Sequence, residues 1–181
     1  MQIVIEGWRS LPQSNSIVNQ FQCLELLKRP EVALFHRDLP YFQDFWQPVT
    51  GLFDAESERA LSQIPPPESD CVPDALFRFG CPFSFAPANA DRIGVFMTAE
   101  WGVVKPQALD LAGHATLKEA HANSDILLLP PSEWSRQGIL RSGGVPERVI
   151  VLPHGVDPQI YHPCSPEERR QIRQQLGWGD R

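Results

Sequence analysis

Several features that mark other classes of protein are missing from these 181 residues. No apolar run approaches the roughly 20 residues that a helix needs to cross a bilayer, so we expect no transmembrane segment. The first residues, MQIVIEGW, lack the basic start and the apolar core of a secretion signal. Four cysteines are present, without a C-x-x-C pair or the spacing of a zinc site. These absences favour a reduced, cytoplasmic chain without a metal site.

Basic residues are also few, with 16 Lys and Arg against 22 Asp and Glu, a formal net charge of −6 and a pI of about 5.3. A nucleic-acid surface needs a basic stripe that releases the counterions of phosphates. The cluster RRQIRQQ near the end of the chain is typical of the solvated face of a helix. We therefore expect no nucleic-acid partner.

What the chain does have is a regular alternation of apolar runs and amphipathic stretches. The pattern predicts strands over 2–7, 32–37, 74–79, 92–101, 126–130 and 148–153, and helices over 16–29, 54–63, 106–122, 132–144 and 165–178. The first three elements fit within 40 residues, as in a β-α-β unit with parallel strands. The strands are apolar throughout, as in a parallel sheet that is covered on both faces. The sequence therefore predicts a doubly wound, mainly parallel α/β domain of Rossmann-like type with flanking helices.

The end of the chain carries its own helix signals. Ser165 and Glu168 have the spacing of a capping box, with Pro166 at the first helical position. This helix would present a narrow apolar stripe with no obvious partner, formed by Ile172, Leu176 and Trp178. We therefore expect a domain over 1–157, followed by a linker and helix over 158–181 that lead to an absent C-terminal domain.

Four stretches, in the same order, resemble group 1 (family 4) glycosyltransferases. RVIVLPHGVDPQIYHP resembles the strand and linker between their two domains, usually P-N-G-V-D-x-x-x-F-x-P, with His154 in place of Asn and Tyr161 in place of Phe. The other three are SNSIVNQ, DRIGVFMTAEWG and SDILLLPPSEWSRQGILRSGGVPERV. The similarity runs over most of residues 2–178 and is weakest from 40 to 73.

The resemblance implies two Rossmann-like domains that face each other across a cleft. This chain would be the N-terminal, acceptor-side domain of a retaining, nucleotide-sugar-dependent hexosyltransferase. The C-terminal domain would bind most of the nucleotide-sugar donor, so the chain alone would hold no cofactor and be inactive. The acceptor would be a sugar, a glycan or a lipid, and the enzyme would be cytoplasmic or peripheral to a membrane. The alternative is a free-standing Rossmann-like module that binds a ligand or a protein without catalysis.

The loop after the first strand, EGWRSLPQSNS, leaves the carboxyl end of a central strand, where α/β sheets bind ligands. Its single glycine does not match the G-x-G-x-x-G of a dinucleotide site. Arg9 offers its donors to a diphosphate or is an exposed cation, and Asn19 bonds an acceptor hydroxyl or braces the loop. Either Ser14 or Ser16 is expected to cap the first helix. The residues predicted to contact acceptor or donor are Gly7, Trp8, Arg9, Ser16, Asn19 and Trp101.

Glu100 is the predicted catalytic residue, because a carboxylate at the end of an apolar strand is costly unless it is paired or functional. In the family, many members have His at this position. Glu100 would accept hydrogen bonds from a sugar hydroxyl or act as a base on the acceptor; alternatively it forms a salt bridge with Arg9 or Arg78. Trp101 either stacks on a sugar ring or packs in the fold.

The segment PHGVDP is interpreted as a hinge, with His154, Gly155 and Asp157 at the hinge and the rim of the cleft. His114 and His121 lie seven residues apart, which is not the i, i+4 spacing of a helical metal pair, so we expect no metal. The sequence also lacks the G-x-S-x-G of a hydrolase nucleophile.

Overall fold

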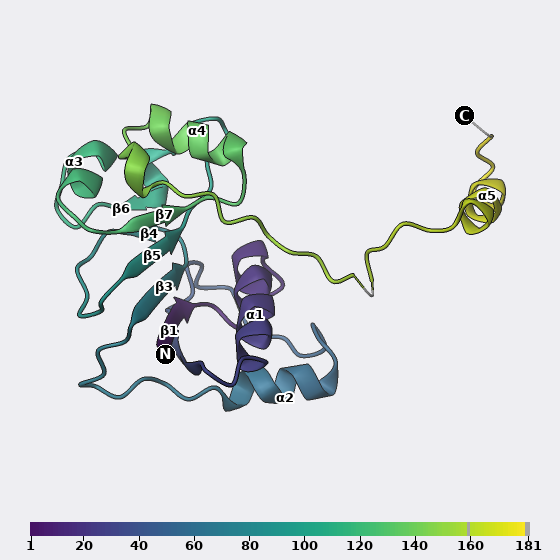
Figure 1. The fold of residues 1–181 in the computed structure, drawn as a ribbon, viewed down its shortest axis with the longest axis horizontal. Helices are drawn as coiled ribbons and strands as arrows, with labels where there is room; N and C mark the ends of the chain where they lie inside the picture. Colours follow the sequence, from purple (N-terminus) through teal and green to yellow (C-terminus); the bar gives the residue numbers. More distant parts are fainter. Residues whose placement is uncertain (159, 180–181) are drawn as a thin grey trace.

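The fold is an α/β domain built on a five-stranded, all-parallel sheet of order β2-β1-β3-β5-β7 (Figure 1). The structure is a computed structural model and describes every residue except 159, 180 and 181. The predicted doubly wound, mainly parallel architecture is confirmed. Within the described residues, no helix combines the length and the apolar composition that crossing a membrane requires.

The elements follow each other in the expected strand-helix alternation. The large sheet contains β1 (Gln2–Gly7), β2 (Ala33–Asp38), β3 (Ala75–Phe79), β5 (Ile93–Phe96) and β7 (Leu127–Leu129), and a small parallel sheet pairs β4 (Phe83–Ser84) with β6 (Leu109–Asp110). The helices are α1 (Ser14–Leu27), α2 (Ala55–Gln63), α3 (Leu117–Ala122), α4 (Glu133–Arg141) and α5 (Pro166–Gln175), with 3-10 turns at Pro106–Ala108 and Pro146–Arg148.

Apolar side chains from alternate strand positions form a core on each face of the sheet. On one face, Ile3 and Ile5 of β1 pack with Cys23 of α1 and Leu61 of α2. On the other face, the core contains Val95 of β5, Leu128 of β7, Leu117 of α3 and Ile139 of α4. Burial on both faces explains why the strands carry continuous apolar runs rather than an alternating pattern.

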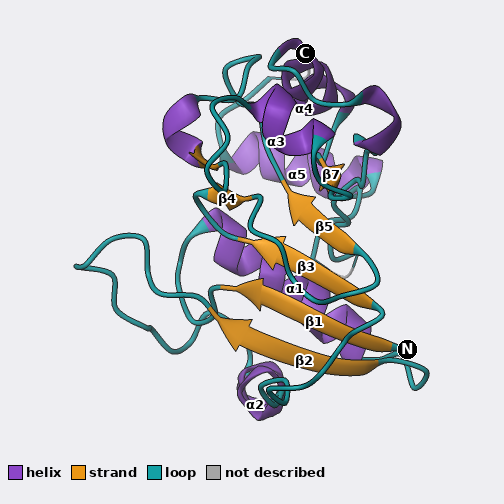
Figure 2. Ribbon diagram, turned by 90° about the vertical axis from the view of Figure 1, so that its left-hand side faces the viewer, coloured by secondary structure: helices purple, strands orange, loops and turns teal. Residues whose placement is uncertain are grey.

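The strand order reverses next to β1. The chain passes from β1 outward to β2, and then returns to the other side of β1 for β3, β5 and β7. The strand arrows in Figure 2 point the same way, so their carboxyl ends share one edge. Gly7 and Phe79, the last residues of β1 and β3, are partners in register at this edge. Open α/β sheets bind ligands outside the carboxyl ends of the strands at such a reversal.

The helix predicted over 106–122 is wrong. A 3-10 turn and β6 occupy its first part, and Ala112 and Gly113 then adopt positive φ angles of 51° and 89°. Two consecutive left-handed residues cannot continue a right-handed helix. The chain resumes helical structure only at α3, where the side chain of Thr116 accepts a hydrogen bond from the Glu119 N–H.

Two predicted strands are shorter than expected. The strand predicted over 92–101 ends at Phe96, because its neighbour β7 pairs only along Gly94 to Phe96. The strand predicted over 148–153 is reduced to one bridge between Leu128 and Val149, although the N–H of Ile150 still donates to the Leu128 carbonyl. These residues continue the sheet edge without forming a regular strand.

The C-terminal helix has the predicted cap. Ser165 and Glu168 form a reciprocal capping box at the start of α5. The predicted apolar stripe is exposed, and it consists of Ile172, Leu176 and Trp178. In Figure 1, α5 stands apart from the sheet and its helices at the end of an extended segment. The division of the chain at residue 157 stays a prediction.

Candidate functional site

The loop after β1 is anchored by a buried tryptophan. Trp8 is 1% exposed, its Nε1–H donates to the Pro40 carbonyl at 2.9 Å, and its ring meets Trp46 edge-on at 5.2 Å. These contacts attach the segment 41–53, which follows β2, to the loop after β1. Trp8 therefore shapes the site from inside the fold, and its predicted contact with a ligand stays a prediction.

Gly7 is required by the packing of a helix side chain. A Cβ atom at Gly7 would lie 2.7 Å from Asn19 Nδ2 and 3.0 Å from the Phe79 carbonyl oxygen. Both distances are shorter than ordinary contacts, so no larger residue fits without a shift of α1 or β3. From the sequence, Gly7 was predicted to let the backbone approach a ligand closely. In the structure, the group that lies close to Gly7 is the side chain of Asn19.

Asn19 braces the loop, as one of the two interpretations held. Its side chain is fully buried, and Nδ2 donates to the Trp8 carbonyl at 2.9 Å. The same Nδ2 lies 2.9 Å from His36 Nε2, which must act as the acceptor because an amide NH₂ can only donate. His36 is therefore neutral, with its proton on Nδ1, and burial lowers the pKa of its imidazole.

The cap of the first helix is neither of the two predicted serines. The N-cap is Gln13, whose side chain accepts a hydrogen bond from the Ser16 N–H. Ser16 is buried, and its hydroxyl accepts from the Leu11 N–H at 3.3 Å and from Gln20 Nε2 at 3.1 Å. Ser16 thus stabilises the turn into α1, and its predicted contact with a ligand stays a prediction.

Arg9, in the loop after β1, forms a two-point ion pair with Asp38, the last residue of β2. Arg9 Nε donates to Asp38 Oδ1 at 2.8 Å, Nη2 bonds Oδ2, and Nη1 donates to the Leu61 carbonyl at 2.7 Å. Asp38 Oδ1 also lies 3.3 Å from His36 Nδ1. Partial burial raises the pKa of Asp38, but the hydrogen bonds and the charge of Arg9, with the His36 ring beside them, hold it well below its usual range.

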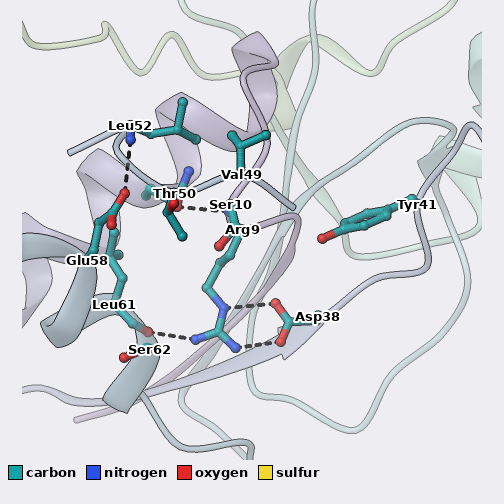
Figure 3. Close-up of a pocket in the computed structure, with 11 residues that line it drawn as sticks. Arg9, Ser10, Asp38, Tyr41, Val49, Thr50, Leu52, Glu58, Leu61 and Ser62 are labelled. Atoms are coloured by element: carbon teal, nitrogen blue, oxygen red, sulfur yellow. Dashed lines mark hydrogen bonds and ion pairs between the residues drawn. The ribbon is translucent and has the colours of Figure 1, made fainter. Parts of the chain in front are cut away.

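A pocket of about 370 Å³ opens beside this ion pair, at the carboxyl ends of β1 and β2 (Figure 3). The loop after β1, the segment 41–53 and α2 enclose it. Most of the residues that line it are of polar type, although much of the surface they present is apolar; they are Arg9, Ser10, Gln20, Asp38, Tyr41, Val49, Thr50, Leu52, Glu58, Leu61 and Ser62. We call it the edge pocket.

Ser10 lies in the edge pocket with a strained backbone, and its backbone hydrogen bonds connect α1 to the segment 41–53. Its φ angle is 60°, a region that costs a non-glycine residue on the order of 1–3 kcal/mol and recurs at functional sites. The N–H of Ser10 donates to Gln20 Oε1 at 3.0 Å, and its carbonyl accepts from the Val49 N–H at 2.8 Å. Nothing in the sequence signals this conformation, because serine has no special preference for it.

Glu58 is a second pocket residue whose role the sequence did not predict. Its Oε1 accepts hydrogen bonds from the N–H groups of Gly51 at 2.6 Å and Leu52 at 2.9 Å, which fixes the end of the segment 41–53 against α2. An acidic residue in the first turn of a helix is usually explained by the helix dipole alone. The capping of a preceding loop depends on tertiary structure, which a local pattern does not encode.

Glu100 lies outside the edge pocket. It occupies a turn after β5, four residues beyond Phe96, and its side chain is exposed. The predicted salt bridge with Arg9 or Arg78 is wrong, because Arg9 bonds Asp38 and Arg78 Nε donates to Glu6 at 2.9 Å. Among the residues that the structure describes, Glu100 forms no ion pair. Its carboxylate is accessible to a ligand, and its catalytic role stays a prediction.

Trp101, beside Glu100, is 71% exposed, and Lys105 Nζ lies 4.1 Å from the centre of its ring. The interpretation of Trp101 as a half-buried packing residue is therefore wrong. Stacking on a sugar ring stays a prediction. β3 separates β1 from β5, so these two strands lie about 10 Å apart, and β2 lies one strand farther from β5.

The ring of His154 packs against Phe96 at the carboxyl end of β5. Its ring centre lies 5.1 Å from that of Phe96, which in turn lies 5.3 Å from that of Phe79. Burial against this neighbour lowers the pKa of His154. Gly155 follows in open space, since a Cβ atom added there would have no neighbour within 4 Å. The hinge role of His154, Gly155 and Asp157 stays a prediction.

His114 and His121, the pair seven residues apart, lie in different environments. His121 is buried, with Nε2 at 2.9 Å from the Ile126 carbonyl and Nδ1 accepting from the Val145 N–H at 3.0 Å. His114 lies in the exposed turn before α3. Among the described residues, no group of three metal-ligating side chains is close enough to hold an ion.

A second hollow, of about 980 Å³, lies on the face of the sheet beside α1. Its floor is apolar and includes Ile3, Ile5, Phe77 and Leu129. It extends from the amino ends of β1 and β3 to Leu129 and Gly155, and it lies away from the carboxyl ends of β1 and β2, where the strand order reverses. The edge pocket, with its converging polar groups, is the better candidate site.

The all-parallel sheet, its order and its flanking helices define a Rossmann-like α/β fold. The particular likeness is to HepE from Anabaena. Its crystal structure with UDP has 14% sequence identity and a TM-score of 0.51, and the match covers 98% of this chain and 50% of HepE. The HepE structures with UDP-glucose (15%, TM-score 0.47) and with UDP and glucose (14%, TM-score 0.49) have the same coverage.

At this identity the comparison shows the fold alone, and this chain spans about half the length of HepE. No family model matches the sequence, and no curated protein matches it.

Proposed function

We propose that the chain is the acceptor-side half of a retaining, nucleotide-sugar-dependent glycosyltransferase of group 1 (family 4). The supporting observation is that almost the whole chain shares its fold with half of HepE, a protein crystallised with UDP and UDP-glucose. The four ordered stretches that resemble the family, ending in PHGVDP, give independent support. A second domain would bind most of the nucleotide-sugar donor.

In this proposal the acceptor lies along the carboxyl edge of the sheet. Glu100 accepts hydrogen bonds from a sugar hydroxyl or takes a proton from the acceptor, since its carboxylate is exposed and is not used by an ion pair among the described residues. Trp101 offers an exposed ring for stacking. His154, through its contact with Phe96, connects the edge to the segment that leads toward the second domain.

Arg9 has a different role from the one that its sequence position indicated. Asp38 and the Leu61 carbonyl occupy three of its five N–H groups, and Asp38 cancels its charge. We therefore place Arg9 on the acceptor side, where it shapes the edge pocket, and not on the diphosphate of the donor.

The proposal is tested by measuring sugar transfer and donor binding separately. Expressed together with the second domain, the protein should transfer a sugar from a UDP-, GDP- or ADP-sugar to a hydroxyl acceptor. Residues 1–181 alone should transfer none, and calorimetric titration should show weak donor binding at best. Submicromolar binding of a nucleotide-sugar to residues 1–181 would overturn the acceptor-side assignment and favour a self-contained binding module.

A further inference from the structure

We propose that the edge pocket binds an uncharged sugar ring of the acceptor and excludes phosphorylated ligands. The inference rests on the proposed function and gives it a substrate class. It is carried by three observations on the pocket: the charge of its lining, the hydroxyl groups that its own hydrogen bonds leave free, and its size.

The charge of the lining is unfavourable for an anion. Arg9 is the one cation among the lining residues, which also include two carboxylates, Asp38 and Glu58. Asp38 is ionised, because Arg9 and His36 hold its pKa low. Arg9 and Asp38 neutralise each other in their two-point ion pair, so Glu58 carries the uncompensated charge of the lining, and it would repel a diphosphate in the pocket. An uncharged ligand experiences no such repulsion.

The polar groups that remain free match the hydroxyls of a sugar. Tyr41 and Thr50 line the pocket, and neither hydroxyl forms a hydrogen bond within the part of the chain that the structure describes. Glu58 uses Oε1 for the backbone of Gly51 and Leu52, which leaves Oε2 as an acceptor. Hydroxyl groups both donate and accept, so together these groups satisfy the donors and acceptors of a polyhydroxylated ring.

The apolar groups and the size also fit one sugar unit. Val49, Leu52 and the ring of Tyr41 give the pocket apolar surface for the C–H face of a sugar. Two exposed aromatic side chains, Phe42 and Phe45, follow Tyr41 on the same segment. The volume of about 370 Å³ lies near the lower limit of small-molecule pockets, roughly 300–1,000 Å³, and suits a monosaccharide unit of a longer acceptor.

The test is an NMR titration of the ¹⁵N-labelled chain with uncharged sugars. The probes are methyl α-glucoside, methyl α-mannoside, methyl β-galactoside and N-acetylglucosamine, with glucose 1-phosphate and inorganic diphosphate as the anions. At least one uncharged sugar should shift the amides of Ser10, Thr50 and Leu52 and the Nε–H of Arg9 in a saturable way. Neither anion should shift them at the same concentration.

Two variants assign the binding to the free hydroxyls. Tyr41→Phe and Thr50→Val each remove one hydroxyl and keep the side-chain shape, and each should weaken sugar binding by about fivefold, the effect of one neutral hydrogen bond. Tyr161→Phe removes a hydroxyl from an exposed residue outside the pocket and should leave binding unchanged. Glu58→Gln removes a carboxylate and should let glucose 1-phosphate bind. The dispersion of each spectrum shows whether the variant is folded.

Several results would overturn the inference. They are saturation by diphosphate with no response to sugars, no response to any uncharged sugar, or sugar-induced shifts that Tyr41→Phe and Thr50→Val leave unaltered. Failure of the proposed function is a separate outcome. Sugar binding in the edge pocket without transfer by the two-domain protein would support the pocket and refute the enzyme.

Discussion

Arg9 and Asp38 form a two-point ion pair across the carboxyl ends of two neighbouring strands, β1 and β2. The pair connects the loop after β1 to the end of β2 and forms one side of the edge pocket (Figure 3). Arg9 is mostly buried, with 18% of its side chain exposed, whereas 56% of the Asp38 side chain is exposed. Solvent screening at Asp38 therefore limits what the pair contributes to stability.

Asp38→Asn should lower the free energy of unfolding by about 1 kcal/mol at neutral pH and by less in acid. Partial burial raises the pKa of Asp38, but Arg9 and His36 hold it below its ordinary value. A carboxyl whose pKa is depressed on folding contributes stability above its unfolded pKa of about 4 and loses that contribution as the pH falls.

Denaturant midpoints measured from neutral pH to about pH 2 should therefore converge for the wild type and Asp38→Asn. Asp44→Asn is the control, because Asp44 is an exposed acid on the segment 41–53 with no ion pair among the described residues. A difference between wild type and Asp38→Asn that stays constant down to the lowest pH would contradict the role given to the ion pair.

Gly7→Ala should destabilise the fold by about 1–3 kcal/mol, because the new methyl group would press against Asn19 and the Phe79 carbonyl. Gly155→Ala is the matched control. A Cβ at Gly155 has no neighbour within 4 Å, so this variant should be unchanged or up to about 1 kcal/mol more stable. Urea unfolding of both variants measures the contrast. Equal stability of the two would mean that Asn19 can move away from Gly7.

Glu100→Gln should lower turnover of the two-domain enzyme by on the order of a hundredfold or more, if the carboxylate acts as a base or stabilises developing charge. The free energy of unfolding should change by less than about 0.5 kcal/mol, because Glu100 is exposed and forms no ion pair within the described residues. Glu147→Gln, at another exposed acid, should alter neither quantity. Normal turnover of Glu100→Gln removes this residue from the active site.

Cys23 should resist thiol reagents in the native protein, whereas Cys164 should react. Cys23 is fully buried in α1, and burial raises its pKa to about 12, so almost no thiolate forms near neutral pH. Cys164 is exposed before α5. Mass spectrometry after brief alkylation, with and without denaturant, identifies the modified residue. Alkylation of Cys23 under native conditions would show that α1 opens readily from the sheet.

The sheet could be predicted from the sequence because each strand leaves a local trace. The runs around Ile3, Phe77 and Val95 are apolar on both faces, and the helix 54–63 begins with an effective cap, Asp54. The prediction of one helix over 106–122 was wrong in its first part, where the chain forms a 3-10 turn and β6. Thr116 and Glu119 have the spacing of a helix-start signal, which the prediction over 106–122 did not use, and α3 begins there in the structure.

The candidate site was only partly predictable, because it depends on which distant residues meet. The loop that contains Arg9 could be identified because it follows β1. The pairing of Arg9 with Asp38 and the strained backbone of Ser10 leave no pattern in the local sequence. Glu58 is a further example, since its donors lie in a loop that the resemblance covers most weakly. Strand ends can be located from sequence alone, but the pairing of loops at those ends requires the fold.

The contact between Phe96 and His154 supplies a built-in reporter for the orientation of the C-terminal segment. A benzene ring 5.1 Å from an imidazole shifts the resonances of its carbon-bound protons through the ring current. The backbone of this segment remains tied to the sheet as far as Leu152, whose N–H donates to the Pro130 carbonyl. A rotation that begins after Leu152 would separate the two rings. In the proposed two-domain protein, the proton resonances of His154 would then record the opening and closing of the cleft without any attached label.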